Sequence, residues 1–502
     1  MRILNSEIAK QWEAYTIEKE QITVLDLMHR ACEAFVERFI DFFTPDHGIV
    51  KIFSGLGNNG ADGVLIARLL SEKMYSVELY VIRYTDETSK EFDSQIAEYE
   101  KLHPVYSITS EYIELNIEAG DIVIDALFGT GLNRPLPDLC NSVIRNFNSS
   151  GALIVSVDMP SGLKTDDFSA NSEIVNADFT FTFQAPKLSA FLPSTGRYYG
   201  ELHVIDIGLL EEFWDEQMID TPLTIQGDEI SLMLKPRQTF SHKGTYGHVL
   251  VASGSQGFAG AAILTTKAAL VSGAGLVTSF VPKNFAGFIH NSVPEALVLE
   301  DDHEKRLTEF PRIEKYSSIA LGPGIGTHEE TAKLVYKFLK KSHQTLVIDA
   351  DAINILAEHK DWLELIPTNS IFTPHPKELE RLLGRSENEF ERLNLMKHFT
   401  KTYQCYCLVK GAYTCVCCPD GEVYFNTTGN AAMAKGGSGD VLTGVIAGLL
   451  AQGYHPKQAV LIAVYWHGLA GDIAAEFKSE QSVLATDIIN CMGTAYKRMF
   501  EE

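Results

Sequence analysis

Strands that end in a glycine-rich turn and lead into a helix recur along this chain of 502 residues. The apolar runs predict strands over 49–53, 77–82, 121–126 and 153–157, then over 248–252, 318–321, 346–348, 371–373 and 408–409. Strands separated by helices pair in parallel, and parallel strands bring their carboxyl ends to one edge of the sheet. The sequence therefore predicts an α/β fold with doubly wound sheets and ligand sites along the strand ends.

The chain is long enough for two domains. Residues 209–240 interrupt the alternation with acids and prolines, so we expect one domain over 1–215 and another over 225–502. Hydrophobic residues make up 45% and charged residues 22%, as in soluble globular proteins, and the net charge of −24 disfavours nucleic acid as a partner. No targeting segment is evident, and no uncharged run reaches the roughly 18 residues of a membrane span. We expect a cytoplasmic protein without a membrane partner.

The glycine turn of the segment 436–440, GGSGD, opens directly into an apolar helix. A helix begins with unpaired backbone N–H groups and a partial positive charge, so this turn predicts an anion site, and a phosphoryl group fits it. Asp440 would repel a phosphate there, which suggests that it is a base that takes a proton from a hydroxyl. The alternative is that Asp440 only caps the helix.

Eight cysteines do not make a disulfide scaffold in a chain of this length. Five of them are close in sequence, which suggests a zinc site as one alternative. Their Cys-x-Cys spacing places the members of each pair on one face of a strand, so we favour reduced cysteines packed in a core. These five are Cys405, Cys407, Cys415, Cys417 and Cys418.

Three motifs of the first half, GLGNNGADG, VIDALFGTGLNRP and VDMPSGL, follow predicted strands. Over about 1–215 the chain resembles the NAD(P)H-hydrate epimerase domain of the YjeF N-terminal family, which implies a Rossmann-like sheet. By this resemblance Asp158 contacts the substrate and transfers a proton. Potassium would be held by Asn59, Asp125 and Ser161, whose oxygens suit a hard cation. The hydrated nucleotide would be bound by Asn58, Asn59, Gly60, Ala61 and Asp62, and by Gly129, Thr130, Gly131, Leu132, Asn133, Arg134 and Pro135, with Ala61 standing where the family commonly has glycine.

The motifs of the second half are HKGTYG, GSQGFAGAA, LGPGIG, VIDADAIN, TPHPKE, KGAYT and GGSGDVLTGVIAGLLAQG. Over about 225–502 they resemble the ADP/ATP-dependent NAD(P)H-hydrate dehydratases, which implies a ribokinase-like α/β sandwich. By this resemblance the adenine nucleotide is bound by Lys410, Gly411, Ala412, Tyr413, Thr414 and Gly439, and the hydrated dinucleotide by Ala261, Gly324, His375 and Asp440. His375 between two prolines is open to a second interpretation, as a turn residue satisfied by the backbone. Departures from the family pattern are Ala431, Ala432, Lys435 and Ser438.

The two resemblances together imply a bifunctional enzyme for nicotinamide repair, an isomerase joined to a lyase. The first domain would interconvert R- and S-NAD(P)HX, and the second would dehydrate the S form with Mg²⁺ and ADP, giving AMP and phosphate, or with ATP. A homo-oligomer is expected by the same resemblance. Two alternatives remain: a small-molecule kinase of the same superfamily, and an N-terminal domain that binds without catalysing.

Overall fold

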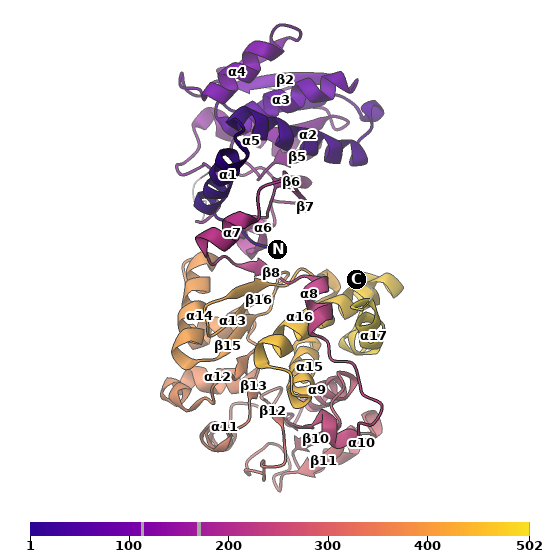
Figure 1. Ribbon diagram of the computed structural model, residues 1–502. Helices are drawn as coiled ribbons and strands as arrows, with labels where there is room; N and C mark the ends of the chain where they lie inside the picture. The colour runs from indigo at the N-terminus through magenta and orange to yellow at the C-terminus, as the bar shows by residue number, and fades with distance from the viewer. Residues whose placement is uncertain (112–114, 168–171, 501–502) are drawn as a thin grey trace. The chain divides into compact units, whose positions relative to one another are not determined.

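The computed structural model describes residues 1–111, 115–167 and 172–500. Its contacts form two compact units, which we call the N-terminal unit, Arg2–Thr221, and the C-terminal unit, Pro222–Glu502 together with Met1. Figure 1 colours the chain from one terminus to the other. Both units are layered α/β structures, as the sequence predicts.

The N-terminal unit contains a seven-stranded sheet of order β3-β2-β1-β4-β5-β6-β7, in which all pairs are parallel. Strand order reverses between β1 and β4, which is where a doubly wound sheet opens a crevice for a ligand. The Rossmann-like fold is confirmed. The strands are β1 (Val50–Ser54), β2 (Val77–Ile82), β3 (Val105–Ile108), β4 (Ile122–Ala126), β5 (Leu153–Val157), β6 (Phe179–Phe183) and β7 (Glu201–Ile205).

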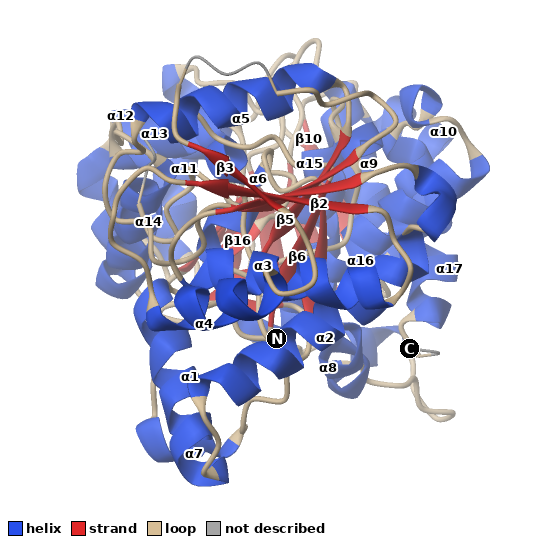
Figure 2. Ribbon diagram, turned by 90° about the horizontal axis from the view of Figure 1, so that it is seen from above, coloured by secondary structure: helices blue, strands red, loops and turns tan. Residues whose placement is uncertain are grey.

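Helices cover both faces of this sheet, and in Figure 2 α5 lies on the opposite side from α2, α3 and α4. Alternate residues of each strand serve the two faces, so Ile52 packs in the core with α2 and α3 whereas Phe53 packs with α5. The segment before β1 holds two helices, α1 and α2, and α3 begins inside the glycine turn. The helices are α1 (Ser6–Glu20), α2 (Val24–Phe42), α3 (Asn58–Glu72), α4 (Lys90–Tyr99), α5 (Asp138–Ser150), α6 (Pro193–Gly196) and α7 (Glu212–Gln217), with 3-10 turns η1 (Pro45–His47) and η2 (Leu188–Phe191).

The C-terminal unit contains a ten-stranded sheet of order β11-β10-β9-β12-β13-β14-β15-β16-β17-β8. It is parallel from β11 to β15, and a β15-β16-β17 antiparallel meander then extends it. The strands are β8 (Leu223–Thr224), β9 (His248–Ala252), β10 (Leu276–Val281), β11 (Leu297–Glu300), β12 (Ser318–Leu321), β13 (Leu346–Ile348), β14 (Ile371–Phe372), β15 (Tyr406–Val409), β16 (Cys415–Cys417) and β17 (Val423–Phe425).

Helices flank this sheet in two layers, with α11 to α14 on one side and α9, α15, α16 and α17 on the other (Figures 1 and 2). This sandwich confirms the predicted ribokinase-like fold class. The helices are α8 (Gly227–Met233), α9 (Ala259–Val271), α10 (Ala286–Ser292), α11 (Glu329–Lys341), α12 (Asp351–Glu358), α13 (Pro376–Leu383), α14 (Glu389–Tyr403), α15 (Ser438–Ala451), α16 (Pro456–Phe477) and α17 (Ala485–Arg498), with 3-10 turns η3 (Lys243–Tyr246), η4 (Lys360–Leu365), η5 (Ala431–Met433) and η6 (Glu480–Ser482).

Helix α15 lies against α9 with its backbone almost in contact. A Cβ added to Gly444 would lie 2.3 Å from the carbonyl oxygen of Thr265, and one added to Gly448 would lie 1.9 Å from Ser272 Oγ. Glycine is therefore required at both positions. The next helix, α16, is the one described helix long and apolar enough for a membrane span by composition, and 78% of that window is buried in the protein core.

Two segments differ from the sequence interpretation or refine it. Residues 223–234, within the segment 209–240 that interrupts the alternation, belong to the C-terminal unit, because β8 pairs with β17 and Ile230 is buried in the core. The five clustered cysteines are all buried and free, and Cys407 lies opposite Cys417 across the β15-β16 pair. Burial raises the pKa of the Cys405 and Cys418 thiols, which keeps them protonated.

Candidate active sites

A cavity of about 580 Å³ lies at the carboxyl ends of β1 and β4 in the N-terminal unit. It is at the point where the strand order reverses, as expected for a doubly wound sheet. Most residues that the epimerase resemblance assigns to substrate line it: Asn58, Asn59, Asp62, Gly129, Thr130, Gly131, Leu132, Asn133, Arg134 and Asp158.

Three residues of the same prediction do not line this cavity, namely Gly60, Ala61 and Pro135. Gly60 and Ala61 are on the buried side of the first turn of α3. A Cβ added to Gly60 would lie 2.1 Å from the carbonyl oxygen of Gly55, and Ala61 has no exposed surface. They shape the turn, and the alanine methyl packs in the core rather than narrowing the cavity.

Asp158 follows β5 and has a left-handed backbone, with φ of 66°. Its Oδ1 accepts hydrogen bonds from Thr182 Oγ1 at 3.3 Å and from the N–H of Phe183 at 3.2 Å. It also forms an ion pair with the ammonium of Lys187, whose side chain is almost completely buried. Sequence reasoning missed Lys187, because 29 residues separate it from Asp158.

Asp125 and Ser161, two of the predicted potassium ligands, contact each other below the cavity. Ser161 donates to Asp125 through Oγ at 2.6 Å and through its N–H at 2.8 Å, and Asp125 has no exposed surface. Burial raises the pKa of Asp125, and the bonds from Ser161 oppose that rise. Asn59, the third, lies against Gly129, where a Cβ would be 3.1 Å from its Oδ1.

The Asn59 side chain has an unsatisfied polar atom. Its Nδ2 is buried and has no hydrogen-bond partner among the residues described in the structure. Turning the amide by 180° would place Oδ1 there instead, and a buried carbonyl oxygen can be satisfied by a cation. The donor chemistry of the three residues, all of which carry oxygen, suits a hard cation.

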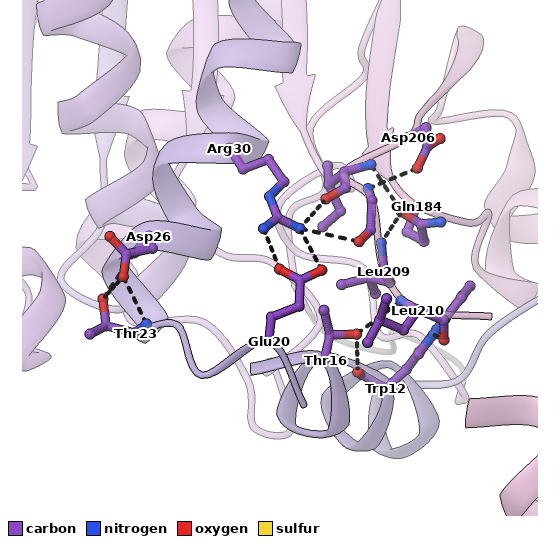
Figure 3. A network of polar contacts seen from close by, with 12 residues as sticks. Trp12, Thr16, Glu20, Thr23, Asp26, Arg30, Gln184, Asp206, Leu209 and Leu210 are labelled. Atoms are coloured by element: carbon purple, nitrogen blue, oxygen red, sulfur yellow. Dashed lines mark hydrogen bonds and ion pairs between the residues drawn. The ribbon is translucent and has the colours of Figure 1, made fainter. Parts of the chain in front are cut away.

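Helices α1 and α2 form a further part of the cavity wall, through residues that sequence reasoning did not single out. Lys10, Glu13 and Ile17 come from α1, and α2 contributes Val24, Leu27, Met28 and Ala31. Figure 3 shows what holds α1: Trp12 Nε1 donates to the carbonyl of Leu210 at 2.7 Å, and the N–H of Leu210 donates to Thr16 Oγ1 at 3.1 Å. The sequence alone does not show which side of α1 faces the cavity.

Carboxyl groups dominate the chemistry of this cavity. Desolvation by the cavity walls raises the pKa of Glu13 to about 7, assisted by the charge of Asp158 and opposed by Lys187 and Lys10, although the residue is exposed to solvent. Burial also raises the pKa of Asp62 well above its usual range, again assisted by Asp158. Perturbed carboxyl groups in a cleft are typical of acid–base catalysis.

The second cluster is in the C-terminal unit, at the carboxyl ends of β12 to β15. Lys410, directly after β15, forms an ion pair with Asp349, directly after β13, at 2.9 Å. Asp349 has only 1% of its surface exposed, and its other oxygen accepts a bond from Thr443 Oγ1 at 2.7 Å. The pair fixes Lys410 beside the first turn of α15, because a Cβ added to Gly439 would be 3.0 Å from Lys410 Nζ.

Helix α15 begins within the GGSGD turn. Its N-cap is Gly437, with φ of 96°, and no side chain caps its first N–H groups, so an anion can bind them. Asp440 is in the first turn, and burial raises its pKa to about 7, with a further increase from the Asp349 charge and a decrease from Lys410. A carboxylate with that pKa is suited to general-base catalysis near neutral pH.

The other predicted residues of this domain lie on neighbouring strand ends. A Cβ added to Gly324, after β12, would lie 3.1 Å from that of Ala261 at the start of α9. His375 caps α13, its Nδ1 accepting the N–H groups of Lys377 at 3.1 Å and Glu378 at 3.2 Å. The backbone role considered for His375 is thus present, and its Nε2 faces Glu378. Residues 411–414 form the turn between β15 and β16.

The loop before α15 is anchored to α16. Asp472 accepts the N–H of Gly429 at 2.8 Å and the amide of Asn430 at 2.7 Å. Ala431 and Ala432, which depart from the family pattern, form the 3-10 turn η5. Lys435, another departure, donates to the carbonyl of Val483 at 2.7 Å, so its ammonium group lies at the end of η6.

Comparison with known proteins matches both halves. Residues 249–493 fit a family model described as NAD(P)H-hydrate dehydratase, and residues 24–189 fit one described as YjeF-related protein N-terminus. The bifunctional NAD(P)H-hydrate repair enzyme Nnr of Moorella thermoacetica is 34% identical over 470 residues, which cover 90% of this chain and 88% of that protein.

Solved structures match about half of the chain. A hypothetical protein of Streptococcus mutans, SMU.573, aligns with a TM-score of 0.50 at 31% identity, covering 55% of this chain and all of that one. The ADP/ATP-dependent NAD(P)H-hydrate dehydratase of Bacillus subtilis, co-crystallised with ATP and Mg²⁺, aligns with a TM-score of 0.48 at 31% identity, covering 55% of this chain and 99% of that one. With both halves matched in the same order as in a full-length relative, the chain belongs to the family of bifunctional NAD(P)H-hydrate repair enzymes.

Proposed function

We propose that this chain repairs hydrated nicotinamide cofactors. Its N-terminal unit interconverts R- and S-NAD(P)HX, and its C-terminal unit dehydrates the S epimer to NAD(P)H. The observation that carries this proposal is that Asp440, Gly439, Lys410 and Asp349 gather at the uncapped start of α15. That arrangement supplies a base, backbone donors and a cation for phosphoryl transfer.

The N-terminal cavity suits a hydrated dinucleotide. Its volume of about 580 Å³ is in the range of small-molecule sites. Lys10 and Arg134 are the cations that line it, and α3 begins at its wall with no side-chain cap. In a chain of net charge −24, such local donors are what a pyrophosphate needs.

Potassium is the cation that we assign to Asp125, Ser161 and Asn59. Their oxygen chemistry fits it, and the buried carboxylate of Asp125 provides a charge to balance. When bound, the ion would stabilise the contact between Asn59 at the start of α3 and Gly129 in the turn after β4.

Dehydration in the C-terminal unit requires loss of the ring hydroxyl, which is a poor leaving group. Hydroxide leaves a carbon centre slowly, and a phosphate ester of the same hydroxyl leaves readily. Asp440 would take the hydroxyl proton while the N–H groups at the start of α15 stabilise the phosphoryl group in transfer. Mg²⁺ would neutralise the nucleotide phosphates. Lys410 to Thr414 and Gly439 would hold the nucleotide, and Ala261, Gly324 and His375 would position the dinucleotide.

The test is near-ultraviolet absorbance after the purified protein is mixed with R- and S-NADHX, with ADP and Mg²⁺ or with ATP and Mg²⁺. We expect recovery of NADH from both epimers. The nucleotide that supports recovery is the phosphoryl donor, and if it is ADP the products include AMP and phosphate. Recovery that stops at the S fraction would refute the epimerase assignment. A stable phosphoester with no NADH would show a small-molecule kinase instead.

A further inference from the structure

Glu13 lies on the face of α1 that lines the cavity, and hydrogen bonds from the adjacent face hold the helix in place. Glu13 and Ile17, four residues apart on α1, both line the cavity. Trp12 and Thr16 occupy the adjacent face and are hydrogen-bonded to Leu210 (Figure 3). The carboxyl group of Glu13 is therefore presented to whatever occupies the cavity, and α1 cannot turn it away without breaking these bonds.

Asp158, on the same cavity, is held as a carboxylate by its partner. Lys187 Nζ pairs with Asp158 and donates to Thr182 Oγ1 at 2.8 Å and to the carbonyl of Ala185 at 3.2 Å, in a side chain that is only 2% exposed. A buried ammonium needs an ionised partner. These contacts hold the Asp158 carboxyl group in place at the cavity.

Glu13 has the opposite environment. Among the residues described in the structure it makes no ion pair and no side-chain hydrogen bond. The charged groups around it are Lys10 on its own helix and Asp62, Asp158 and Lys187 from the other elements. Lys187 already forms its ion pair with Asp158. Glu13 is exposed within the cavity that Asp158 also lines, so its carboxyl group is free to exchange a proton with a bound substrate.

We propose that Glu13 is the second acid–base residue of the epimerase site, donating a proton while Asp158 accepts one. This rests on the proposed function. Hydration of an enamine leaves the new hydroxyl on the carbon bonded to the ring nitrogen, and such a carbon can invert by ring opening. Opening and closing the ring requires one acid and one base, and the pair of carboxyl groups supplies them.

The step balances within the pair. Asp158 takes the hydroxyl proton, the carbon–nitrogen bond breaks with its electrons going to nitrogen, the oxygen becomes an aldehyde, and Glu13 protonates the nitrogen. Rotation about the adjacent carbon–carbon bond exposes the other aldehyde face. The nitrogen attacks that face as its proton returns to Glu13, and Asp158 returns its proton to the oxygen, giving the other epimer.

The experiment uses the full chain with purified R-NADHX or S-NADHX, Mg²⁺ and the working nucleotide, with uncatalysed epimerisation subtracted. Glu13→Gln keeps the shape and loses the proton. We expect NADH formation from R-NADHX to fall by about 10²–10⁴-fold and the rate from S-NADHX to be unchanged. Glu18→Gln, on the same helix and outside the cavity lining, is the matched control and is expected to behave as the parent chain.

The pH profile separates chemistry from structure. Epimerisation by the parent chain is expected to fall as pH rises through about 7, the pKa of Glu13, and this limb should persist in Glu18→Gln and in Glu13→Asp. Parental use of R-NADHX by Glu13→Gln would overturn the proposal, as would a rise in KM alone with kcat unchanged. If Glu13→Gln melts early, Glu13→Asp decides, since loss of the limb there would overturn it. A parent chain that uses S-NADHX but not R-NADHX would instead refute the proposed epimerase function.

Discussion

Replacing Asp440 with asparagine separates catalysis from stability in the C-terminal unit. The amide keeps the shape of the side chain but cannot take a proton, so we expect kcat for dehydration of S-NADHX to fall by about 10²–10⁴-fold. Because the pKa of Asp440 is raised to about 7, the parent rate should increase with pH through that value and level off above it. The variant should lose this dependence.

The same substitution should stabilise the unit at neutral pH. The folded-state pKa of Asp440 is above its ordinary value, so folding disfavours the ionised form and stability is lost as pH rises from about 4 to 7. A pKa raised from 3.8 to about 7 corresponds to about 4 kcal/mol. Residual solvent contact and the Lys410 charge reduce the penalty, so we expect about 1–3 kcal/mol, or about 2–6 °C in melting temperature.

Stopped assays of NADH formation and calorimetry at pH 5 and pH 8 test both effects. The gain in melting temperature should be complete at pH 8 and less than half as large at pH 5, where the folded group is neutral but the unfolded group, with its ordinary pKa of 3.8, is already largely ionised. An Asp440→Asn variant that keeps a tenth of the parent rate would refute the base assignment. A variant that is less stable than the parent at pH 8 would refute the electrostatic account.

Other predictions concern single contacts. Gly444→Ala should cost about 1–3 kcal/mol in urea unfolding, because the methyl group would be 2.3 Å from the carbonyl of Thr265; an unchanged midpoint would contradict the close helix contact. Lys410→Met should raise KM for the nucleotide and cost about 3–5 kcal/mol, since it leaves the buried Asp349 without its ion-pair partner; parental stability in calorimetry would contradict a stabilising ion pair. Thr23→Ala should cost about 1 kcal/mol in thermal unfolding through loss of the α2 cap, and dehydration of S-NADHX should be unchanged. A loss of that activity would contradict a purely local effect of the cap.

Strands with two covered faces could be predicted closely from the sequence. The strands over 77–82, 153–157, 248–252, 318–321 and 346–348 begin and end as expected, because a buried parallel strand is a continuous apolar run stopped by glycine or acid. Strand β8 could not be found this way. It is two residues long and exists because β17 pairs with it.

The candidate sites were predictable in part, for a related reason. Residues in the glycine turns can be recognised from the local sequence, and the chain topology brings them together. The residues that contact or surround them cannot be recognised in this way. Lys187 is 29 positions away from Asp158 in the sequence, and Glu13 is one of several acids on a helix of mixed polarity. Only the packing of α1 decides which acid faces the cavity.

The backbone at Asp158 affects how substitutions there can be interpreted. Its φ of 66° is a conformation that asparagine tolerates and that costs most other residues about 1 kcal/mol or more. Alanine at this position would therefore alter the course of the chain after β5 as well as remove a carboxylate, and lost turnover could have either origin. Asparagine leaves the peptide geometry alone, so it is the substitution whose effect on epimerisation reports on proton transfer.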